Sequence, residues 1–157
     1  MALIVQKYGG TSVGSVERIH AVAERVARYL ARGDQVVVVV SAMSGETNRL
    51  VELGRSVSAR PLAREMDVLT AAGEQVTIAL VAMALSDRGH PGKSYLADQV
   101  AIRTDSSFGK ARISAIDTER LLADLASGIV PVVAGFQGVD DDGNLTTLGR
   151  GGSDTTA

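Results

Sequence analysis

The 157-residue sequence contains no cysteine and no tryptophan, and only 3% of its residues are aromatic. Without cysteine it can form neither a disulfide framework nor a thiolate metal site, and two histidines, His20 and His90, are too few for a histidine-rich zinc site. Any metal ion would have to be held by oxygen ligands. Because aromatic side chains are scarce, Val, Leu, Ile and Ala must pack the core, and the chain is long enough to bury one.

The sequence also lacks a secretory leader pattern and a long charge-free apolar run. The longest run, around residues 76–85, is too short to span a bilayer, so we expect no membrane association and a cytoplasmic location. The net charge of −2 is divided unevenly: residues 1–64 carry nine Lys and Arg against five Asp and Glu, and residues 65–157 carry seven against thirteen. Neither half is basic enough to indicate a nucleic-acid partner.

The hydrophobic pattern predicts a strand, a helix and a second strand in the first 40 residues. Leu3–Val5 is predicted to be a short buried strand, Ser15 to cap a helix, and Gly33 to end that helix in a left-handed conformation. Five consecutive valines, in QVVVVV at residues 35–40, favour a strand that is covered on both faces, as in a parallel sheet flanked by helices. These elements form a right-handed crossover unit, and they predict an α/β fold.

Two helices and a hairpin are predicted farther along. Residues 47–57 look helical, and Pro61 is expected in the first turn of a long helix. One apolar stripe of that helix consists of Met66, Leu69, Gly73, Val76, Leu80 and Met83. Its second half, VTIALVAMAL, is apolar on nearly every side, so it is either central to the domain or buried against another subunit. VDDDGNLTTL predicts a hairpin in which Gly143-Asn144 takes positive φ angles.

The first candidate site is QKYGGTSVGS, where a strand leads through two glycines into a helix. A helix start presents backbone N–H groups and the positive end of the helix dipole, which favour an anion. Lys7 adds a positive charge, and Thr11 and Ser12 add hydroxyl donors. The glycine spacing matches neither a Walker A loop nor a dinucleotide fingerprint. The alternative interpretation is a tight turn beside a solvated lysine.

The second candidate site is LGRGGSDTT, where glycines again precede a helix, capped by Ser153 or Asp154, with Arg150 among them. Two glycine-rich helix starts in one small α/β chain favour a shared ligand beyond the carboxyl ends of the strands, although Arg150 by itself is more typical of a surface arginine. This helix would stop within its first turn, so we expect the natural sequence to continue past Ala157.

A third group of candidates consists of Ser41, Thr47 and Glu74. Ser41 and Thr47 follow the valine strand and can donate to a substrate, or they can simply end a strand and start a helix. Glu74 lies in an otherwise apolar helix. Because glutamate is rarely buried without a partner, Glu74 is expected to face either a functional cation or a structural arginine. DDDGN lacks the ligands of a calcium loop, because Gly138 and Gly149 stand where ligands are needed.

Four stretches together resemble the N-terminal catalytic part of the aspartate kinases, within the amino acid kinase family. They are KYGGTSVGSVERI, VVVVVSAMSGETNRL, REMDVLTAAGEQVTIALVAMAL and VAGFQGVDDDGNLTTLGRGGSDTTA. The family more often has Phe at the position of Tyr8. The resemblance implies a three-layer αβα sandwich with a mainly parallel central sheet. We expect residues 1–157 to be the N-terminal portion of the kinase domain, without regulatory ACT domains, and to be inactive as an isolated fragment.

The resemblance also implies a reaction, in which ATP phosphorylates the side-chain carboxylate of L-aspartate to 4-phospho-L-aspartate, the first step towards lysine, threonine and methionine. The residues implied to hold the phosphates are Lys7, Gly9, Gly10, Thr11 and Ser12. Those implied to hold aspartate or to lie near the reacting groups are Ser41, Thr47, Glu74, Arg150, Gly152 and Ser153. Asp154 would orient Lys7, and Mg²⁺ would be held through the ATP phosphates.

Elementary chemistry agrees with this assignment. A carboxylate acceptor is already ionised at neutral pH, so no general base is required. The repulsion between two anions about 4 Å apart, roughly 4 kcal/mol at an effective dielectric constant of 20, must be relieved by positive groups such as Lys7. Arg150 would bind a carboxylate, and Glu74 would pair with the substrate ammonium.

Other interpretations stay open at this point. A glutamate or acetylglutamate kinase is the nearest alternative, although Glu74 argues against acetylglutamate, whose amine carries no charge. A non-catalytic phosphate-binding or nucleotide-binding module is a further alternative. We also expect a homodimer, or another oligomer, through the apolar helix around residues 76–85.

Overall fold

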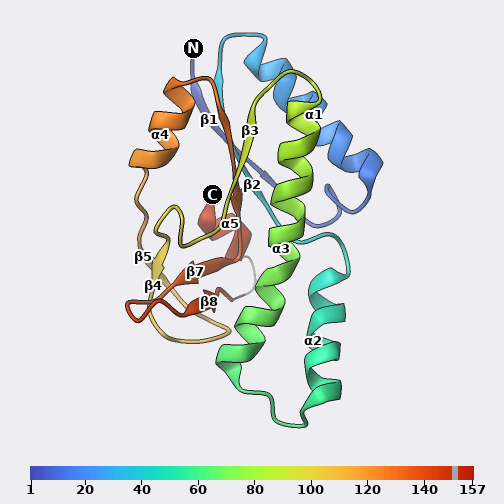
Figure 1. The fold of residues 1–157 in the computed structure, drawn as a ribbon, viewed down its shortest axis with the longest axis vertical. Coiled ribbons are helices and arrows are strands. Elements are labelled where there is room, and N and C mark those ends of the chain that lie inside the picture. Colours follow the sequence, from blue (N-terminus) through green and yellow to red (C-terminus); the bar gives the residue numbers. More distant parts are fainter. Residues whose placement is uncertain (150–151) are drawn as a thin grey trace.

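The computed structural model describes residues 1–149 and 152–157 (Figure 1). These residues form two four-stranded sheets and five helices. Along the chain they are β1 (Leu3–Tyr8), α1 (Val16–Leu30), β2 (Gln35–Val40), α2 (Glu46–Val57), α3 (Ala63–Ser86), β3 (Gly92–Tyr95), β4 (Arg103–Thr104), β5 (Ile113–Ala115), α4 (Glu119–Ala126), β6 (Val130–Ala134), β7 (Gln137–Val139), β8 (Leu145–Thr147) and α5 (Gly152–Thr156).

The larger sheet is parallel and has the strand order β1-β2-β6-β3. Helices cover both of its faces. Alternate residues of a strand point to opposite sides, so each strand contributes side chains to both layers. Val36, Val38 and Val40 pack towards α1 and α3, whereas Val37 and Val39 pack towards α4. The predicted three-layer α/β fold with a mainly parallel sheet is therefore confirmed.

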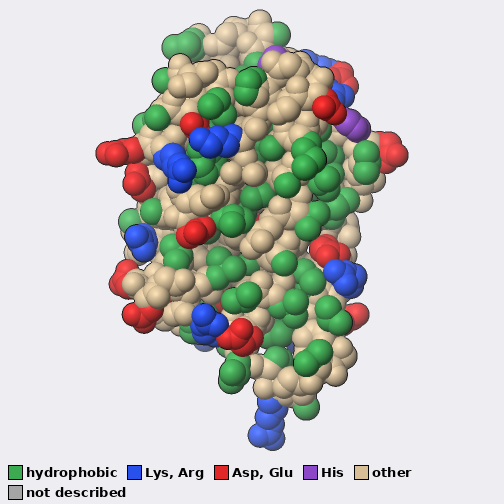
Figure 2. All heavy atoms as spheres, viewed as in Figure 1, with side chains coloured by type: hydrophobic (Ala, Val, Ile, Leu, Met, Phe, Trp, Pro, Cys, Tyr) green, Lys and Arg blue, Asp and Glu red, His purple; other side chains and the backbone are tan. Residues whose placement is uncertain are grey.

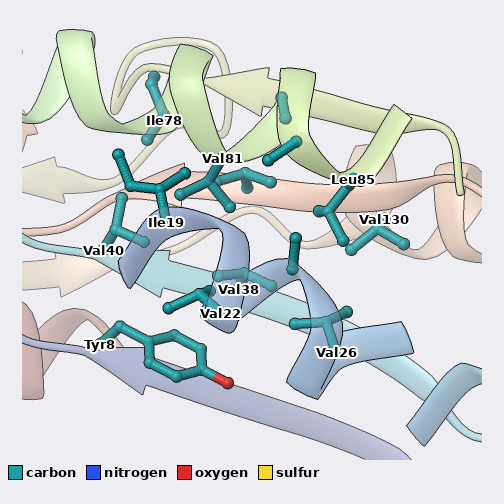
Figure 3. Packing of buried hydrophobic residues seen from close by; sticks show 14 of the residues in the cluster. Tyr8, Ile19, Val22, Val26, Val38, Val40, Ile78, Val81, Leu85 and Val130 are labelled. Carbon is teal, nitrogen blue, oxygen red and sulfur yellow. The ribbon is translucent and has the colours of Figure 1, made fainter. Parts of the chain in front are cut away.

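The main core lies between this sheet and the pair α1 and α3 (Figure 3). Ile19, Val22 and Val26 of α1 face Val81 and Leu85 of α3, and each of the five is at most 3% exposed. As the sequence predicts, Ser15 caps α1, its Oγ accepting from the Arg18 N–H at 3.3 Å, and Gly33 follows the helix with φ +83°.

Strand β1 corrects one prediction. It forms the edge of the sheet, and Leu3 and Val5 are 53% and 48% exposed rather than buried. These two side chains lie on the α4 side of the sheet, where they line an apolar hollow of about 210 Å³ with residues of α4. Helix α4 packs over β2 and β6, and so it leaves the outer face of β1 open.

Helix α3 also departs from prediction in two details. Pro61 lies before the helix, whose N-cap is Leu62. The predicted stripe does not mark the buried side, because Val76 and Met83 are 51% and 62% exposed. A helix that is apolar nearly all round gives no pattern from which the buried side can be read. By length and composition α3 meets the criteria for a membrane-spanning helix, but 56% of its most apolar 18 residues are buried inside the fold.

The smaller sheet has the order β5-β4-β7-β8, and β7 and β8 form the predicted antiparallel hairpin. Within the expected turn, Gly143 has φ +80°, whereas Asn144 does not take a positive φ. The Asp140 side chain fixes the turn instead, because its Oδ1 accepts from the backbone N–H groups of Asp142 and Asn144 at 3.1 and 2.8 Å.

Candidate active site

The carboxyl ends of β1, β2 and β6 lie together at one edge of the parallel sheet, and a cavity of about 370 Å³ opens there. This is where ligands bind in open α/β sheets. The structure brings nine of the predicted site residues into the cavity lining: Lys7, Gly9, Gly10, Ser41, Thr47, Glu74, Gly152, Ser153 and Asp154. The two glycine-rich helix starts, far apart in the sequence, thus share one cavity.

Lys7 and Asp154 join the two ends of the chain. Lys7 is the penultimate residue of β1, and its Nζ lies 2.6 Å from Oδ1 of Asp154 in α5. The lysine side chain is 29% exposed, and that of the aspartate is 69% exposed. The ion pair therefore holds a cation at the rim of the cavity, where it can still reach a negatively charged ligand.

The loops after β1 and β2 pack directly on each other. The Ser44 N–H donates to the Gly10 carbonyl at 3.1 Å. A Cβ atom at Gly10 would lie only 2.9 Å from the carbonyl oxygen of Ala42, which is backbone and cannot move aside easily. Glycine is therefore required at position 10 by close approach, and the two loops form one continuous wall.

Ser41 and Ser153 connect the loop after β2 with α5. Their hydroxyl oxygens lie 2.7 Å apart, with Ser41 as the donor. Ser153 and Asp154 were predicted as N-cap candidates, but both lie inside α5, which begins at Gly152. In that position they present side chains to the cavity.

Glu74 is the buried acid of the site, with only 2% of its surface exposed. Its Oε1 accepts from the Ala42 N–H at 3.0 Å, whereas no hydrogen-bond partner for Oε2 occurs among the described residues. Gly73 permits this contact, because a Cβ there would lie 2.7 Å from the Ala42 Cβ. Burial raises the pKa of Glu74 to about 7, although the bond from Ala42 opposes the rise. The free Oε2 is therefore a buried hydrogen-bond acceptor for which a ligand could supply the donor.

The start of α2 also faces the cavity, through Gly45, Thr47 and Asn48. Gly45 is the N-cap, with φ +82°, and no side chain caps the helix. The first N–H groups of α2 are therefore not occupied by a capping side chain and can meet a negatively charged ligand group. Sequence reasoning noted Thr47 but missed Gly45, although a glycine directly before a helix, in SGETN, was the available signal.

Phe136 is a cavity residue that sequence reasoning could not have found. Its backbone is left-handed, with φ +71°, which is rare for a bulky residue. The Leu148 N–H donates to the Phe136 carbonyl at 2.8 Å, so the residue directly after strand β8 supports this unusual segment. Strained backbone persists only where the surroundings enforce it, and it concentrates at functional sites.

Comparison with known proteins agrees with the architecture. The model of the amino acid kinase family matches residues 2–157. The chain belongs to the amino acid kinase family. An aspartate kinase of Stutzerimonas stutzeri and an aspartokinase of Pseudomonas aeruginosa are each 64% identical to it over 156 residues. These matches cover 99% of the chain but 38% of each relative, so the chain spans well under half the length of these curated relatives.

Solved structures of family members superpose on the whole chain. The aspartate kinase of Synechocystis is 48% identical, covers 99% of this chain with 25% of its own, and gives a TM-score of 0.82. Aspartokinase III of E. coli, crystallised in complex with aspartate and ADP, gives a TM-score of 0.87 over 100% of this chain and 45% of its own. At 24% identity, the second likeness supports the fold alone.

Two of the predicted site residues, Thr11 and Ser12, do not line this cavity. Ser12 lines a neighbouring cavity of about 310 Å³, together with Lys7, Arg18 and Arg25. Thr11 is exposed and lines neither cavity. Arg150 lies outside the described residues. Among the described residues, Lys7 borders both spaces.

The described residues that line this cavity offer few ligands for a metal ion. No group of three His, Cys, Asp or Glu side chains gathers anywhere in residues 1–149 and 152–157. Of the two carboxylates in the cavity lining, Asp154 pairs with Lys7, and Glu74 accepts from Ala42 through Oε1, which leaves only Oε2 free. The described side chains alone do not form an oxygen cage for a cation.

Proposed function

We propose that this chain forms the acceptor-binding part of an aspartate kinase active site, which transfers the γ-phosphoryl group of ATP to the side-chain carboxylate of L-aspartate. The observation that carries the proposal is the cavity in which the Lys7–Asp154 ion pair lies with the buried, half-satisfied carboxylate of Glu74. Relatives that are 52–64% identical over the whole chain are aspartate kinases. A homologue of the same fold was crystallised with aspartate and ADP.

In this proposal Glu74 recognises the ammonium group of the acceptor. Its free Oε2 needs a donor, and a cation next to it would lower the pKa of Glu74 from about 7 and keep the carboxyl ionised. Thr47 lines the same cavity and can donate to a substrate carboxylate, as can the open N-terminus of α2. Ser41 would donate to the substrate in place of its hydrogen bond to Ser153. We assign the remaining carboxylate contact to Arg150, whose planar fork suits that group.

The transfer itself requires charge relief rather than a base. A side-chain carboxylate oxygen of aspartate attacks the γ-phosphorus, a new O–P bond forms, and the bond from phosphorus to the β–γ bridging oxygen breaks to release ADP. The acceptor has no proton to lose at neutral pH. Lys7 and the glycine segment at Gly9 and Gly10 would offset the negative charge of the phosphates, with Asp154 holding Lys7 in place.

The residues present fit a nucleotide better than a directly bound metal ion. Gly9 and Gly10 place backbone, rather than side chains, beside Lys7 in the cavity lining. Because Asp154 pairs with Lys7 and Glu74 has a single free oxygen, Mg²⁺ would be held through the ATP phosphates, where it would neutralise charge on the transferring group. Thr11 and Ser12 stay predictions as phosphate ligands.

The test is Lys7→Ala in a full-length chain that carries these 157 residues. Turnover should fall at least about a hundredfold, the usual loss for a preorganised donor to developing charge, in a coupled assay of aspartate-dependent ADP release. Lys93→Ala is the matched control, because Lys93, on β3, pairs with Asp124 of α4, away from the cavity. Near-normal turnover of Lys7→Ala would refute the role of Lys7.

The choice of acceptor is tested by calorimetry with L-aspartate, L-glutamate and N-acetylglutamate. An acceptor whose amine is blocked leaves Glu74 Oε2 without its cation, so acetylglutamate is disfavoured. Binding of ATP without any amino acid would instead favour a non-catalytic nucleotide-binding module. The place of the reaction in lysine, threonine and methionine synthesis follows from this proposal, and the cytoplasmic location stays a prediction.

We also propose that the exposed side of α3 packs on a second copy of the chain. Val76 and Met83 of α3 and Val16 of α1 are each more than half exposed. With Leu80 and Ile19, Val16 and Met83 border a shallow hollow of about 190 Å³ between the two helices. Figure 2 shows hydrophobic side chains gathered over this part of the surface. Exposed apolar patches of this kind are typical of interaction surfaces.

A further inference from the structure

Asp67 is a buried carboxylate in the first half of α3, and it does not line the cavity. Only 2% of its surface is exposed. Its Oδ2 accepts from the backbone N–H groups of Thr147 at 2.8 Å and Gly109 at 3.0 Å, and its Oδ1 accepts from the Thr147 hydroxyl at 2.8 Å. In the described parts of the chain, no Lys or Arg lies within ion-pair distance of it. All three partners are donors, which suits an acceptor-only carboxylate.

These bonds fix the strand that leads into the cavity. Thr147 ends β8, Leu148 follows and supports the left-handed Phe136 segment, and Gly149 lines the cavity. Gly109 belongs to the loop between β4 and β5, so the same carboxylate also anchors that loop. One buried side chain therefore ties α3 to the segment that carries part of the cavity wall.

Asp67 is one of three contacts that α3 makes along a single side. At Ala71, the carbonyl accepts from Nε2 of Gln137, the residue after Phe136, at 3.2 Å. At Glu74, the carboxylate accepts from the Ala42 N–H at 3.0 Å. Residues four and three positions apart lie on one face of a helix. Through these contacts one helix holds β8, β7 and the loop after β2. Residues in or next to each of these three segments line the cavity.

We propose that Asp67 is a positioning residue, which sets the position of the β8 end and of Phe136 and thereby the shape of the acceptor side of the cavity. The proposal rests on the proposed function only for what the cavity binds. The positioning itself is a property of the fold. Asp67 bonds to β8 and to the loop between β4 and β5, and not to the loop after β1 that carries Gly9 and Gly10. Its effect should therefore appear in acceptor binding more than in nucleotide binding.

The first test is kinetic, in a full-length chain that carries these residues. Asp67→Ala removes all three hydrogen bonds that Asp67 accepts. The KM for L-aspartate should rise about tenfold or more, because small misplacements of binding groups are costly. The KM for ATP should stay within about twofold. Asp67→Asn should rescue most of the loss, because an amide oxygen can accept both N–H groups while the amide nitrogen donates to the Thr147 hydroxyl. An unchanged KM for L-aspartate in Asp67→Ala would overturn the proposal.

The second test needs no substrate and uses the same full-length chain. In Asp67→Ala the amides of residues 145–149 should exchange hydrogen about tenfold faster, because a lost buried hydrogen bond loosens the strand locally. Ile78→Ala is the control, because it destabilises α3 on its α1 side without touching β8. Faster exchange that is no greater at 145–149 than in β2, as in the control, would overturn the proposal. If the full-length parent phosphorylates no aspartate, the proposed function fails, and this exchange result still decides the positioning role.

Discussion

The C-terminal half of α3, residues 76–86, packs through apolar side chains, whereas the N-terminal half, residues 63–75, packs through two buried carboxylates. Ile78, Val81 and Leu85 are at most 3% exposed and contact the aliphatic core. Asp67 and Glu74 are each 2% exposed, and each accepts hydrogen bonds from segments that are distant in sequence. The two halves of one helix thus use different forces at the two ends of the fold.

The difference matters because the two forces have different geometry. Apolar burial is non-directional and roughly proportional to area, so it stabilises the fold without specifying positions closely. Hydrogen bonds to a buried carboxylate have narrow distance and angle limits. The apolar half should therefore govern global stability, and the polar half should govern the shape of the cavity.

The largest expected effect is on the apolar half. Leu85→Ala removes a fully buried side chain, and we expect it to lower the free energy of unfolding by about 4 kcal/mol, measured by urea denaturation. Leu122→Ala on α4 is the matched control, because Leu122 is 50% exposed and should cost well under half as much. Equal losses in the two variants would mean that the core does not depend on this half of α3.

The sequence predicted the aliphatic core that packs on the apolar half, because the signal of that core is local, but it did not predict which side of residues 76–86 is buried. The valine run at residues 35–40 and the helical spacing of Ile19, Val22 and Val26 each indicate an element and its burial without knowledge of its partners. Leu3 and Val5 show the limit of such reasoning. Whether an apolar strand is central or lies at an edge depends on what covers it, which local pattern does not contain.

The polar half was harder to predict because its partners are distant in sequence. Asp67, in REMDVL, resembles an exposed residue of a helix start, and its main partner Thr147 lies 80 positions away. Glu74 could be noted because it stands in an apolar stretch. The association of Lys7 with Asp154 came from resemblance to a family, whereas the left-handed Phe136 follows from tertiary packing alone.

The next prediction concerns pH and the polar half. The pKa of Glu74 is about 7 in the folded chain, above the ordinary value of 4.5 that applies to the unfolded chain. The folded state therefore binds the proton more tightly than the unfolded state does. This contribution to stability is complete below about pH 4.5 and is lost as the pH rises through 7, a change of about 3 kcal/mol. In urea unfolding, the stability of the parent relative to Glu74→Gln should fall as the pH rises from about 4.5 to above 7.

Glu24 provides the control for the sign of this effect. It is an exposed carboxylate on α1, and its hydrogen bond to Arg28 lowers its pKa, so its contribution to stability appears as the pH rises. Glu24→Gln should therefore give a weak dependence of the opposite direction. Parallel curves for the parent and Glu74→Gln would contradict the burial of an uncompensated carboxyl at Glu74.

The smallest effect on folding is expected on the exposed side of the apolar half. Met83 is 62% exposed, so Met83→Asp should change the free energy of unfolding of the single chain by no more than about 0.5 kcal/mol, because surface substitutions rarely cost more. If this side of α3 packs on a second copy, sedimentation at micromolar concentration should show the parent as a dimer and Met83→Asp as a monomer, since a buried unpaired charge is costly. Leu122→Asp, on exposed α4, should leave the dimer intact. A monomeric parent, or a dimer that Met83→Asp leaves unchanged, would separate the apolar surface of α3 from any role in assembly.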